Sequence, residues 1–380
     1  MIYLDHSAST PVAPQVLDAM LPYFSEHYAN PSSVHRPGQK AEAALEEARE
    51  NIATCLHCRP DEMFFTSGGT ESNNLAIRGA AYAVRKHSGK THLLTTPVEH
   101  PAVLNTVKDL AGNFSFQMAL IPVNHFGTAS PEGLRSLIQL GTVLASVIYA
   151  NNEVGTINPI DEIGEICREK GILLHTDAVQ AAGYLDIDLS RTNVDMLSIG
   201  AHKFYGPKGV GALFIRKGTR IQGIQTGGSH ERGLRAGTSN VPLIVGMAAA
   251  LKLAVELRDK ERERLSRLRD ELVERVLRAT PDARLTGDPI QRLPHHASFI
   301  FPGVDGNQLV MLLDHAGFAC SSGSACKTGN PEPSEVLLAI GYSADDARSS
   351  LRITLGRSTT QEQITAFCET LANVINKASV

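Results

Sequence analysis

The chain of 380 residues contains no tryptophan, and aromatic residues make up only 5% of it. Its formal net charge is −4, with 36 basic against 40 acidic side chains, so charge does not favour nucleic acid or a membrane surface as the main partner. No apolar run reaches the ~20 residues that a membrane helix needs. Hydrophobic residues nevertheless make up 42%, enough for a large core, and we expect a large and a smaller domain.

The six cysteines match no disulfide framework of secreted domains. Because we also recognise no signal peptide at the start of the sequence, we expect a reducing cytoplasm. Cys55 and Cys58 have CxxC spacing, but they end a predicted helix and have no second pair, so we expect no metal site there. We expect Cys167, Cys320 and Cys368 to be core residues.

Strand-like and helix-like segments alternate through the first two thirds of the chain. The predicted strands are 63–66, 92–95, 114–121, 143–149, 172–176, 194–199 and 210–215. This alternation predicts an α/β fold, in which helices cover both faces of a mainly parallel sheet.

A long helical region at 241–277, densely charged after residue 256, is predicted to link two domains as one helix or as two. The segments after it predict a small α+β domain. We therefore expect a large domain over residues 15–257 and a small domain formed by residues 1–14 and 258–380.

Lys203 lies beside His202 in a turn of small residues that follows a buried strand. Enzymes with α/β folds place their ligands at such strand ends. For this pair alone, a surface loop that carries a lysine is the alternative.

The segment Ser67-Gly-Gly-Thr70 joins a predicted strand to a predicted helix. Its glycines and the free N–H groups of the helix suit an anion, whereas simple capping by Thr70 or Ser67 is the alternative. Because no Gly-Lys-Ser/Thr sequence follows, this is no Walker loop.

Asp177 falls at the end of another apolar strand, where a carboxylate is costly unless it is paired. It would suit a protonated pyridine nitrogen, and Gln180 could reach the same ligand. A helix N-cap is the alternative interpretation of Asp177.

Polar groups thus follow five predicted strands, and the ends of parallel strands meet at one edge of a sheet. They are Thr70, His100, Asn152, Asp177, and His202 with Lys203. A phosphate cradle, a flat imidazole, an amide, a buried carboxylate and a lysine fit pyridoxal phosphate better than a nucleotide.

Cys326 lies among small residues in Cys320–Glu332. A thiol in such a segment can act as a nucleophile, helped by the positive charge of Lys327. An inert loop cysteine is the alternative.

Taken together, seven motifs resemble the cysteine desulfurases of the NifS/IscS type, and the resemblance runs from residue 2 to about residue 360. The motifs are Ile2–Ala8, Asn30–His35, Thr66–Asn73, Asn151–Gly155, His202–Lys203, Gly228–Gly233 and Ser321–Cys326. The resemblance is specific because it depends on the combination of these motifs and not on any one of them.

The resemblance implies a fold-type I pyridoxal phosphate enzyme that works as a cytoplasmic homodimer. Such an enzyme would convert L-cysteine to L-alanine and transfer the sulfur to Cys326 as a persulfide, then to an acceptor protein. Iron–sulfur cluster assembly and the thiolation or phosphorothioation of nucleic acids are compatible pathways, without direct binding of nucleic acid or membrane.

By motif position, the resemblance also implies roles at the cofactor ring. Lys203 should hold the cofactor covalently, and Asp177 should pair with its ring nitrogen. His100 should stack on the ring and take part in proton transfer. Gln180 should bond the phenolic oxygen, and Asn152 should line the same side.

Further roles concern the phosphate, the substrate and the sulfur. The residues expected at the phosphate are Gly69, Thr70, His202 and, reaching the partner subunit's phosphate, Thr238. Arg352 and Asn30 should bind the substrate, Arg352 by clamping its carboxylate with two hydrogen bonds. Cys326 should take the sulfur.

One departure concerns Gly200, because the family often has a hydroxyl residue three positions before the lysine. We expect weaker retention of the cofactor. Two other functions stay open. Another fold-type I enzyme, such as an aminotransferase or selenocysteine lyase, would not require Cys326. A non-catalytic scaffold for sulfur acceptors is disfavoured by the intact Lys203, Asp177 and His100.

Overall fold

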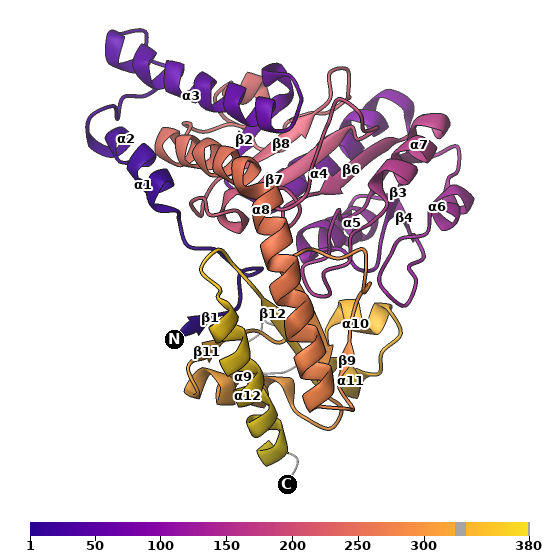
Figure 1. Ribbon diagram of the computed structural model, residues 1–380. Helices are drawn as coiled ribbons and strands as arrows, with labels where there is room; N and C mark the ends of the chain where they lie inside the picture. The colour runs from indigo at the N-terminus through magenta and orange to yellow at the C-terminus, as the bar shows by residue number, and fades with distance from the viewer. Residues whose placement is uncertain (324–331, 379–380) are drawn as a thin grey trace.

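The computed structural model describes residues 1–323 and 332–378. Figure 1 shows a larger part built around a sheet and a smaller part below it, with helix α8 (Val241–Ala279) running from one to the other. None of the helices within the described residues combines the length and apolar character needed to span a bilayer.

The larger part is built on a central sheet. Within the described ranges its strands are, in spatial order, β2 (Met63–Thr66), β8 (Gly211–Ile215), β7 (Met196–Gly200), β6 (Leu173–Asp177), β5 (Thr142–Ser146), β3 (His92–Thr95) and β4 (Gln117–Leu120). Neighbours from β7 to β4 are parallel, whereas β8 runs antiparallel to β7 and β2. The predicted α/β fold with a mainly parallel sheet is confirmed.

Consecutive side chains of the strands enter two separate cores. Phe64 and Leu93 pack with α4 (Gly69–Ser88) and α5 (Pro101–Asn113), whereas Phe65 and Leu94 belong to the larger core. That core also receives side chains from α1 (Pro14–Met20), α3 (Arg36–Cys55), α7 (Ile160–Lys170) and α8. Because both faces are covered, the central strands β5, β6 and β7 are buried along almost their whole length. The short helices α2 (Pro22–Ser25) and α6 (Pro131–Leu137) complete the larger part.

Helix α8 settles the question of one helix or two, since it is a single helix of 39 residues. Its first half buries side chains such as Leu251 against the larger part, and its second half buries Leu265 and Leu272. At 1.5 Å per residue it extends roughly 58 Å, long enough to connect both parts.

The smaller part combines both ends of the chain. As far as the structure describes it, a three-stranded antiparallel sheet has the order β12 (Ser350–Thr354), β10 (His296–Ile300), β9 (Arg284–Leu285). Strand β1 (Ile2–Tyr3) pairs in parallel with β11 (Phe318–Ala319), so the N-terminus lies beside the C-terminal segments (Figure 1). The remaining helices are α9 (Gly306–His315), α10 (Glu335–Ala339), α11 (Ala344–Arg348) and α12 (Gln361–Ala378).

Some boundaries differ from the predictions. Strand β5 ends at Ser146 rather than at residue 149, and β4 covers 117–120 rather than 114–121. Three short 3-10 helices, η1 (Pro60–Glu62), η2 (Ala201–Lys203) and η3 (Glu231–Gly233), were not predicted, nor were β9, β11 and α11. The division into domains at residues 14 and 257 stays a prediction.

Candidate active site

The predicted polar groups gather at the carboxyl edge of the central sheet. Strand β6 ends at Asp177, and β7 ends at Gly200 and continues into η2, which carries Lys203. Strand β2 leads through Gly68 into α4, and His100 is the N-cap of α5 after β3. Because these strands share one direction, their loops meet at one edge.

Asp177 is 4% exposed and is held by two neutral donors. Its Oδ2 accepts a hydrogen bond from Asn73 Nδ2 at 2.6 Å, and its Oδ1 accepts one from the N–H of Val179 at 2.9 Å. The sequence analysis assigned no role to Asn73, which lies one turn into α4. A buried carboxylate oriented in this way can accept a further proton donor from a ligand.

The first turn of α4 is open to an anion. Gly68 is the N-cap, and no side chain in the described residues caps this helix. A Cβ atom on Gly69 would lie 2.6 Å from Val179 Cγ2, so glycine is required for α4 to approach the Asp177 loop. A Cβ atom on Gly200 would lie 3.4 Å from the Gly69 nitrogen, which places position 200 beside the same N–H groups. Capping by Thr70 or Ser67 is therefore not what the structure has.

The N-terminal segment faces Lys203. Lys203 Nζ donates to the carbonyl oxygens of Ser7 and Ala8 at 2.6 and 2.8 Å. Gln180 Nε2 donates to the Ser7 carbonyl at 2.9 Å, while Gln180 Oε1 is buried without a partner in the described residues. Residues 5–8 thus bring Lys203 and Gln180 together, a role that the sequence analysis did not assign to them.

His100 is a neutral imidazole. Burial lowers its pKa, as does the charge of Lys203, against the opposing effect of Asp177. Its Nδ1 accepts the N–H of Ala102 at 3.1 Å, so the proton of the neutral ring is on Nε2. Because the charges of Asp177 and Lys203 both affect the pKa of His100, the three side chains lie within electrostatic range of one another.

Glu99, the residue before His100, is a buried carboxyl group that the sequence analysis missed. Its Oε1 accepts hydrogen bonds from Thr96 Oγ1 at 2.7 Å and from the N–H of Ile148 at 2.8 Å. Burial, assisted by the charge of Asp177, raises the pKa of Glu99 to about 8. The side chain is therefore protonated at neutral pH and braces the loop of His100 against the β5 loop.

His202 is neutral as well, because burial and the charges of Lys203 and Lys208 lower its pKa to about 4. Its Nδ1 lies 3.4 Å from Ser9 Oγ. A neutral imidazole can donate one hydrogen bond to an anion.

Arg352 on β12 forms a second end of the site. Its Nη2 donates to Asp5 Oδ1 at 2.8 Å and its Nη1 to the carbonyl oxygen of Asn152 at 3.1 Å. His296 Nε2 donates to the same carbonyl at 3.1 Å. Arg352 Nε is buried without a partner in the part of the chain described here, and each Nη atom has a second N–H group, so donors remain for a carboxylate.

The loop that carries Thr238 is tied to the first turn of α4. Arg235 Nε donates to Glu71 Oε1 at 2.9 Å. Earlier in the same loop, Glu231 is buried and accepts two hydrogen bonds from Arg49, at 2.8 and 2.9 Å. Thr238 itself is exposed, as a residue that reaches another molecule would be.

Asn30 is exposed, and its Oδ1 accepts the N–H of Ser32 within its own loop. Cys326 lies outside the described residues.

The described cysteines have little thiolate character. Burial raises the pKa of Cys58, Cys167 and Cys320 to about 12 and that of Cys368 to about 11, and it also raises that of Cys55. Cys167, Cys320 and Cys368 are buried, as predicted. Within residues 1–323 and 332–378, no group of three or more His, Cys, Asp or Glu side chains could hold a metal ion.

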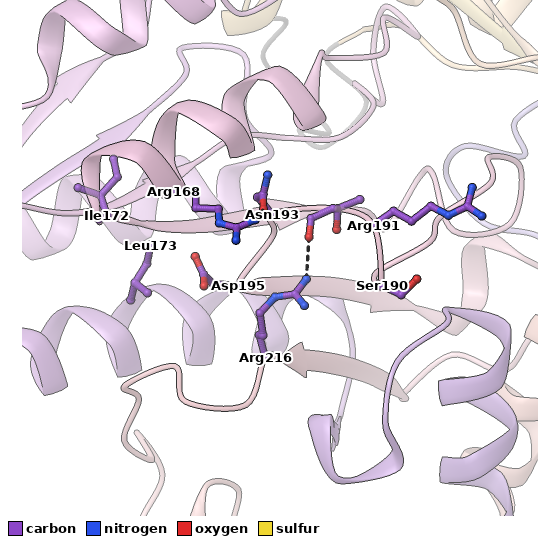
Figure 2. Close-up of a pocket in the computed structure, with 10 residues that line it drawn as sticks. Arg168, Ile172, Leu173, Ser190, Arg191, Asn193, Asp195 and Arg216 are labelled. Atoms are coloured by element: carbon purple, nitrogen blue, oxygen red, sulfur yellow. Dashed lines mark hydrogen bonds between the residues drawn. The ribbon is translucent and has the colours of Figure 1, made fainter.

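Figure 2 shows a cavity of about 560 Å³ at the opposite edge of the sheet, lined by residues that precede β6 and β7 and follow β8. Its arginines already serve the fold. Arg216 Nη2 donates to the carbonyl of Thr192 at 3.0 Å, and Arg168 Nη1 donates to Asn193 Oδ1 at 2.9 Å. We therefore assign the candidate site to the carboxyl edge.

The carboxyl edge has the chemistry for a flat ring that bears a basic nitrogen and an anionic substituent. Asp177 suits the nitrogen, and the N–H groups at the start of α4 suit the anion. Lys203 contacts the Ser7 carbonyl oxygen that Gln180 also contacts, and His100 caps α5 at the same edge.

Comparison with known proteins gives consistent matches over nearly the whole chain. The family model for class-V aminotransferases matches residues 2–367. The cysteine desulfurase IscS of Clostridium botulinum is 45% identical over 378 residues, which cover 99% of this chain and 94% of that protein. A solved structure described as a NifS-like protein has a TM-score of 0.92 at 37% identity, covering 99% of each chain. A structure described as SspA in complex with cysteine has a TM-score of 0.80 at 37% identity, covering 93% of this chain and 99% of that one.

Proposed function

The chain belongs to the class-V aminotransferase family, and we propose that within it the protein is a cysteine desulfurase, which converts L-cysteine to L-alanine and delivers the sulfur to an acceptor protein. One observation carries the proposal to the site. Lys203 Nζ and Gln180 Nε2 both donate to the carbonyl oxygen of Ser7, at the edge of the sheet where β6 ends at Asp177 and the uncapped α4 begins.

The residues at the carboxyl edge fit pyridoxal phosphate. Asp177 would hold the ring nitrogen, and the side-chain amide of Gln180, whose Oε1 is buried without a partner in the described chain, would bond the phenolic oxygen. The uncapped first turn of α4 at Gly69 and Thr70, with His202, would hold the phosphate, and Lys203 would bind the group covalently. When bound, this cofactor supplies an electron sink for bonds at the substrate's α-carbon.

Arg352 would bind the substrate's carboxylate. Its side chain is held at the Asn152 end of the site by Asp5, and its Nε has no partner in the described residues. A guanidinium fixed on one side can present a planar pair of donors on the other. Asn152 would line this end, and we retain Asn30 as a proposed substrate contact.

His100 and Lys203 would move protons. The neutral imidazole of His100 carries its proton on Nε2. Its Nδ1 could accept a second proton only by losing the hydrogen bond from Ala102. We therefore expect His100 first to donate the proton on Nε2. Lys203, which is hydrogen-bonded to two carbonyl oxygens, would exchange protons at the substrate's α-carbon.

Cys326 would act as the sulfur nucleophile. Its thiolate attacks the sulfur of the substrate, the carbon–sulfur bond breaks, and the carbon keeps the electron pair and takes up a proton on the way to alanine. The sulfur remains on Cys326 as a persulfide and passes to an acceptor protein, for cluster assembly or for a thiolation or phosphorothioation pathway. The described cysteines are poor alternatives because burial raises their pKa values.

A second copy of the chain is the proposed partner at two surfaces. A series of exposed apolar side chains follows the N-terminal helices, and Phe24, Tyr28 and Val34 are 56%, 75% and 90% exposed. Apolar side chains grouped in this way favour a protein interface. Exposed Thr238 would reach the partner subunit's cofactor phosphate. We also expect the homodimer to act in the cytoplasm.

The test is the release of sulfide and alanine from L-cysteine, with pyridoxal phosphate and a reductant. Wild type should release both, and Cys326→Ala should release neither while its cofactor absorbance still responds to L-cysteine. Cys320→Ala, at a buried cysteine six residues earlier, is the matched control and should retain both products.

Other outcomes would select the other functions. Amino-group transfer to a 2-oxo acid without sulfide would identify an aminotransferase. A preference for selenocysteine that survives Cys326→Ala would identify a lyase. A protein whose absorbance ignores L-cysteine would be a scaffold for sulfur acceptors.

A further inference from the structure

We propose that Glu153 is a positioning residue for sulfur transfer, which holds Ser334, and with it the chain beside Gly323, at the Asn152 end of the site. This inference rests on the proposed function, since it concerns the step in which Cys326 takes the sulfur. Gly323 and Ser334 belong to the described chain on either side of residues 324–331.

The backbone that carries Glu153 is held on several sides. Asn151 Oδ1 accepts the N–H groups of Glu153 and Val154 at 2.8 and 2.9 Å. Asn151 Nδ2 donates to the carbonyl of Val98 at 2.8 Å, in the loop before His100. The carbonyl of Asn152 accepts from Arg352, as described above. Glu153 therefore projects from a fixed platform that also lines the substrate's end of the site.

The carboxyl group of Glu153 contacts Ser334. Ser334 Oγ donates to Glu153 Oε2 at 2.5 Å, and the serine is only 3% exposed. The same Oγ accepts the N–H of Leu337 at 3.1 Å and so caps α10. One hydroxyl group thus connects the start of α10 to the loop of Asn152.

The same carboxyl group lies against Gly323. A Cβ atom added to Gly323 would lie 3.5 Å from Glu153 Oε2 and 3.6 Å from Ser334 Cβ. The N–H of Gly323 donates to Ser350 Oγ at 3.2 Å, beside Arg352 on β12. Glu153 therefore bonds Ser334 and lies close to Gly323, eleven residues earlier in the sequence, and Gly323 is itself bonded to Ser350 near the Arg352 end of the site.

The charges around Glu153 are compatible with a buried acceptor. Arg352 on β12 attracts its charge and Glu335 on α10 repels it. Glu335 itself is exposed and pairs with Lys108 at 3.8 Å. The Glu153 carboxyl group is used by neither the proposed cofactor contacts nor the proposed substrate contacts, so its partly buried hydrogen bond to Ser334 has no other assigned role.

The length of the chain explains why these contacts affect the reaction. Cys326 follows Gly323 by three residues, and three fully extended residues span at most about 11 Å. The position of Gly323 then limits which places the thiol can reach. A shift of about 1 Å at a reacting pair is enough to slow a reaction strongly.

The experiment separates sulfur transfer from the steps before it in the cofactor-loaded enzyme. Glu153→Ala removes the acceptor, Glu153→Gln keeps an acceptor oxygen, and Ser334→Ala removes the donor. Two readouts are taken in a single turnover with L-cysteine: the change in cofactor absorbance, and the rate of persulfide formation on Cys326 by mass spectrometry.

We expect Glu153→Ala to keep the absorbance change and its dependence on L-cysteine, and to form the persulfide about tenfold more slowly, the effect of losing one hydrogen bond. Glu153→Gln should recover most of the rate. Ser334→Ala should match Glu153→Ala, and the double variant should be no slower than either. Glu335→Gln, the adjacent exposed carboxylate, should keep the wild-type rate.

The proposal is overturned if Glu153→Ala forms the persulfide at the wild-type rate, if Glu153→Gln is as slow as Glu153→Ala, or if the two alanine substitutions are additive. A different result addresses the proposed function. If wild type responds to L-cysteine in absorbance but never forms a persulfide on Cys326, the desulfurase assignment fails first and this inference fails with it.

Discussion

Replacing Glu99 by glutamine should change how stability depends on pH. The carboxyl group is 4% exposed, and burial raises its pKa to about 8. Between pH 4.5 and pH 8 the folded chain keeps the proton that the unfolded chain releases, so the free energy of unfolding falls as pH rises. Glutamine has no proton to lose, and Glu99→Gln removes this contribution.

The size of the effect follows from the two pKa values. Raising the pKa of a glutamate from 4.5 to about 8 corresponds to about 5 kcal/mol, because each tenfold change in an acid constant is about 1.4 kcal/mol. In the variant, an amide N–H₂ group replaces Oε2, which has no partner within the described residues, at a cost of about 1–3 kcal/mol at every pH. Glu99→Gln should therefore be less stable than wild type near pH 5 and more stable near pH 9.

The assay is urea-induced unfolding, followed by circular dichroism from pH 5 to pH 9 at one fixed cofactor concentration. The quantity of interest is the difference between wild type and variant, since other titrating groups cancel in it. Glu47→Gln, on the exposed face of α3, controls for the loss of one negative charge. If the curves of wild type and Glu99→Gln run parallel across this range, Glu99 is not a buried neutral acid and the reasoning is wrong.

Three further predictions concern the cofactor, the substrate and the fold. Gly200→Ser places a hydroxyl group near the nitrogen of Gly69 and should tighten cofactor binding about tenfold; an unchanged dissociation constant would contradict the assigned phosphate site. Arg352→Lys should raise the KM for L-cysteine by about 10- to 100-fold in steady-state assays, because lysine lacks the planar pair of donors; an unchanged KM would remove this residue from substrate binding. Arg49→Met leaves the buried carboxylate of Glu231 without its cation and should lower the free energy of unfolding by about 3–5 kcal/mol in urea titrations; a loss below about 1 kcal/mol would show that the pair contributes little.

Much of the larger part follows from local pattern. Apolar runs that alternate with helical periodicity predict buried parallel strands, because only such strands need two apolar faces. The end of an apolar strand also marks where its next polar residue lies. The sequence therefore predicts that Asp177 and Lys203 lie at the carboxyl edge of the sheet, and the structure has them there.

The sequence alone could not identify the groups whose role depends on which residues surround them in the fold. In the sequence, Glu99 and Glu153 look like ordinary glutamates. Burial by other elements of the fold raises the pKa values of both carboxyl groups. Asn73 was quoted within a motif, but its bond to Asp177 joins residues 104 positions apart.

The sequence by itself determined the type of sheet, the order of its elements and the ends of the strands that carry the site, because these depend on the spacing of apolar residues along a few turns or strands. Only the tertiary structure decided that Ile2 pairs with Phe318, that Ser7 accepts from both Lys203 and Gln180, and that α8 continues without a break. These features arise from contacts between distant segments, and no local pattern encodes which segments will meet or which side chains will lose water when they do.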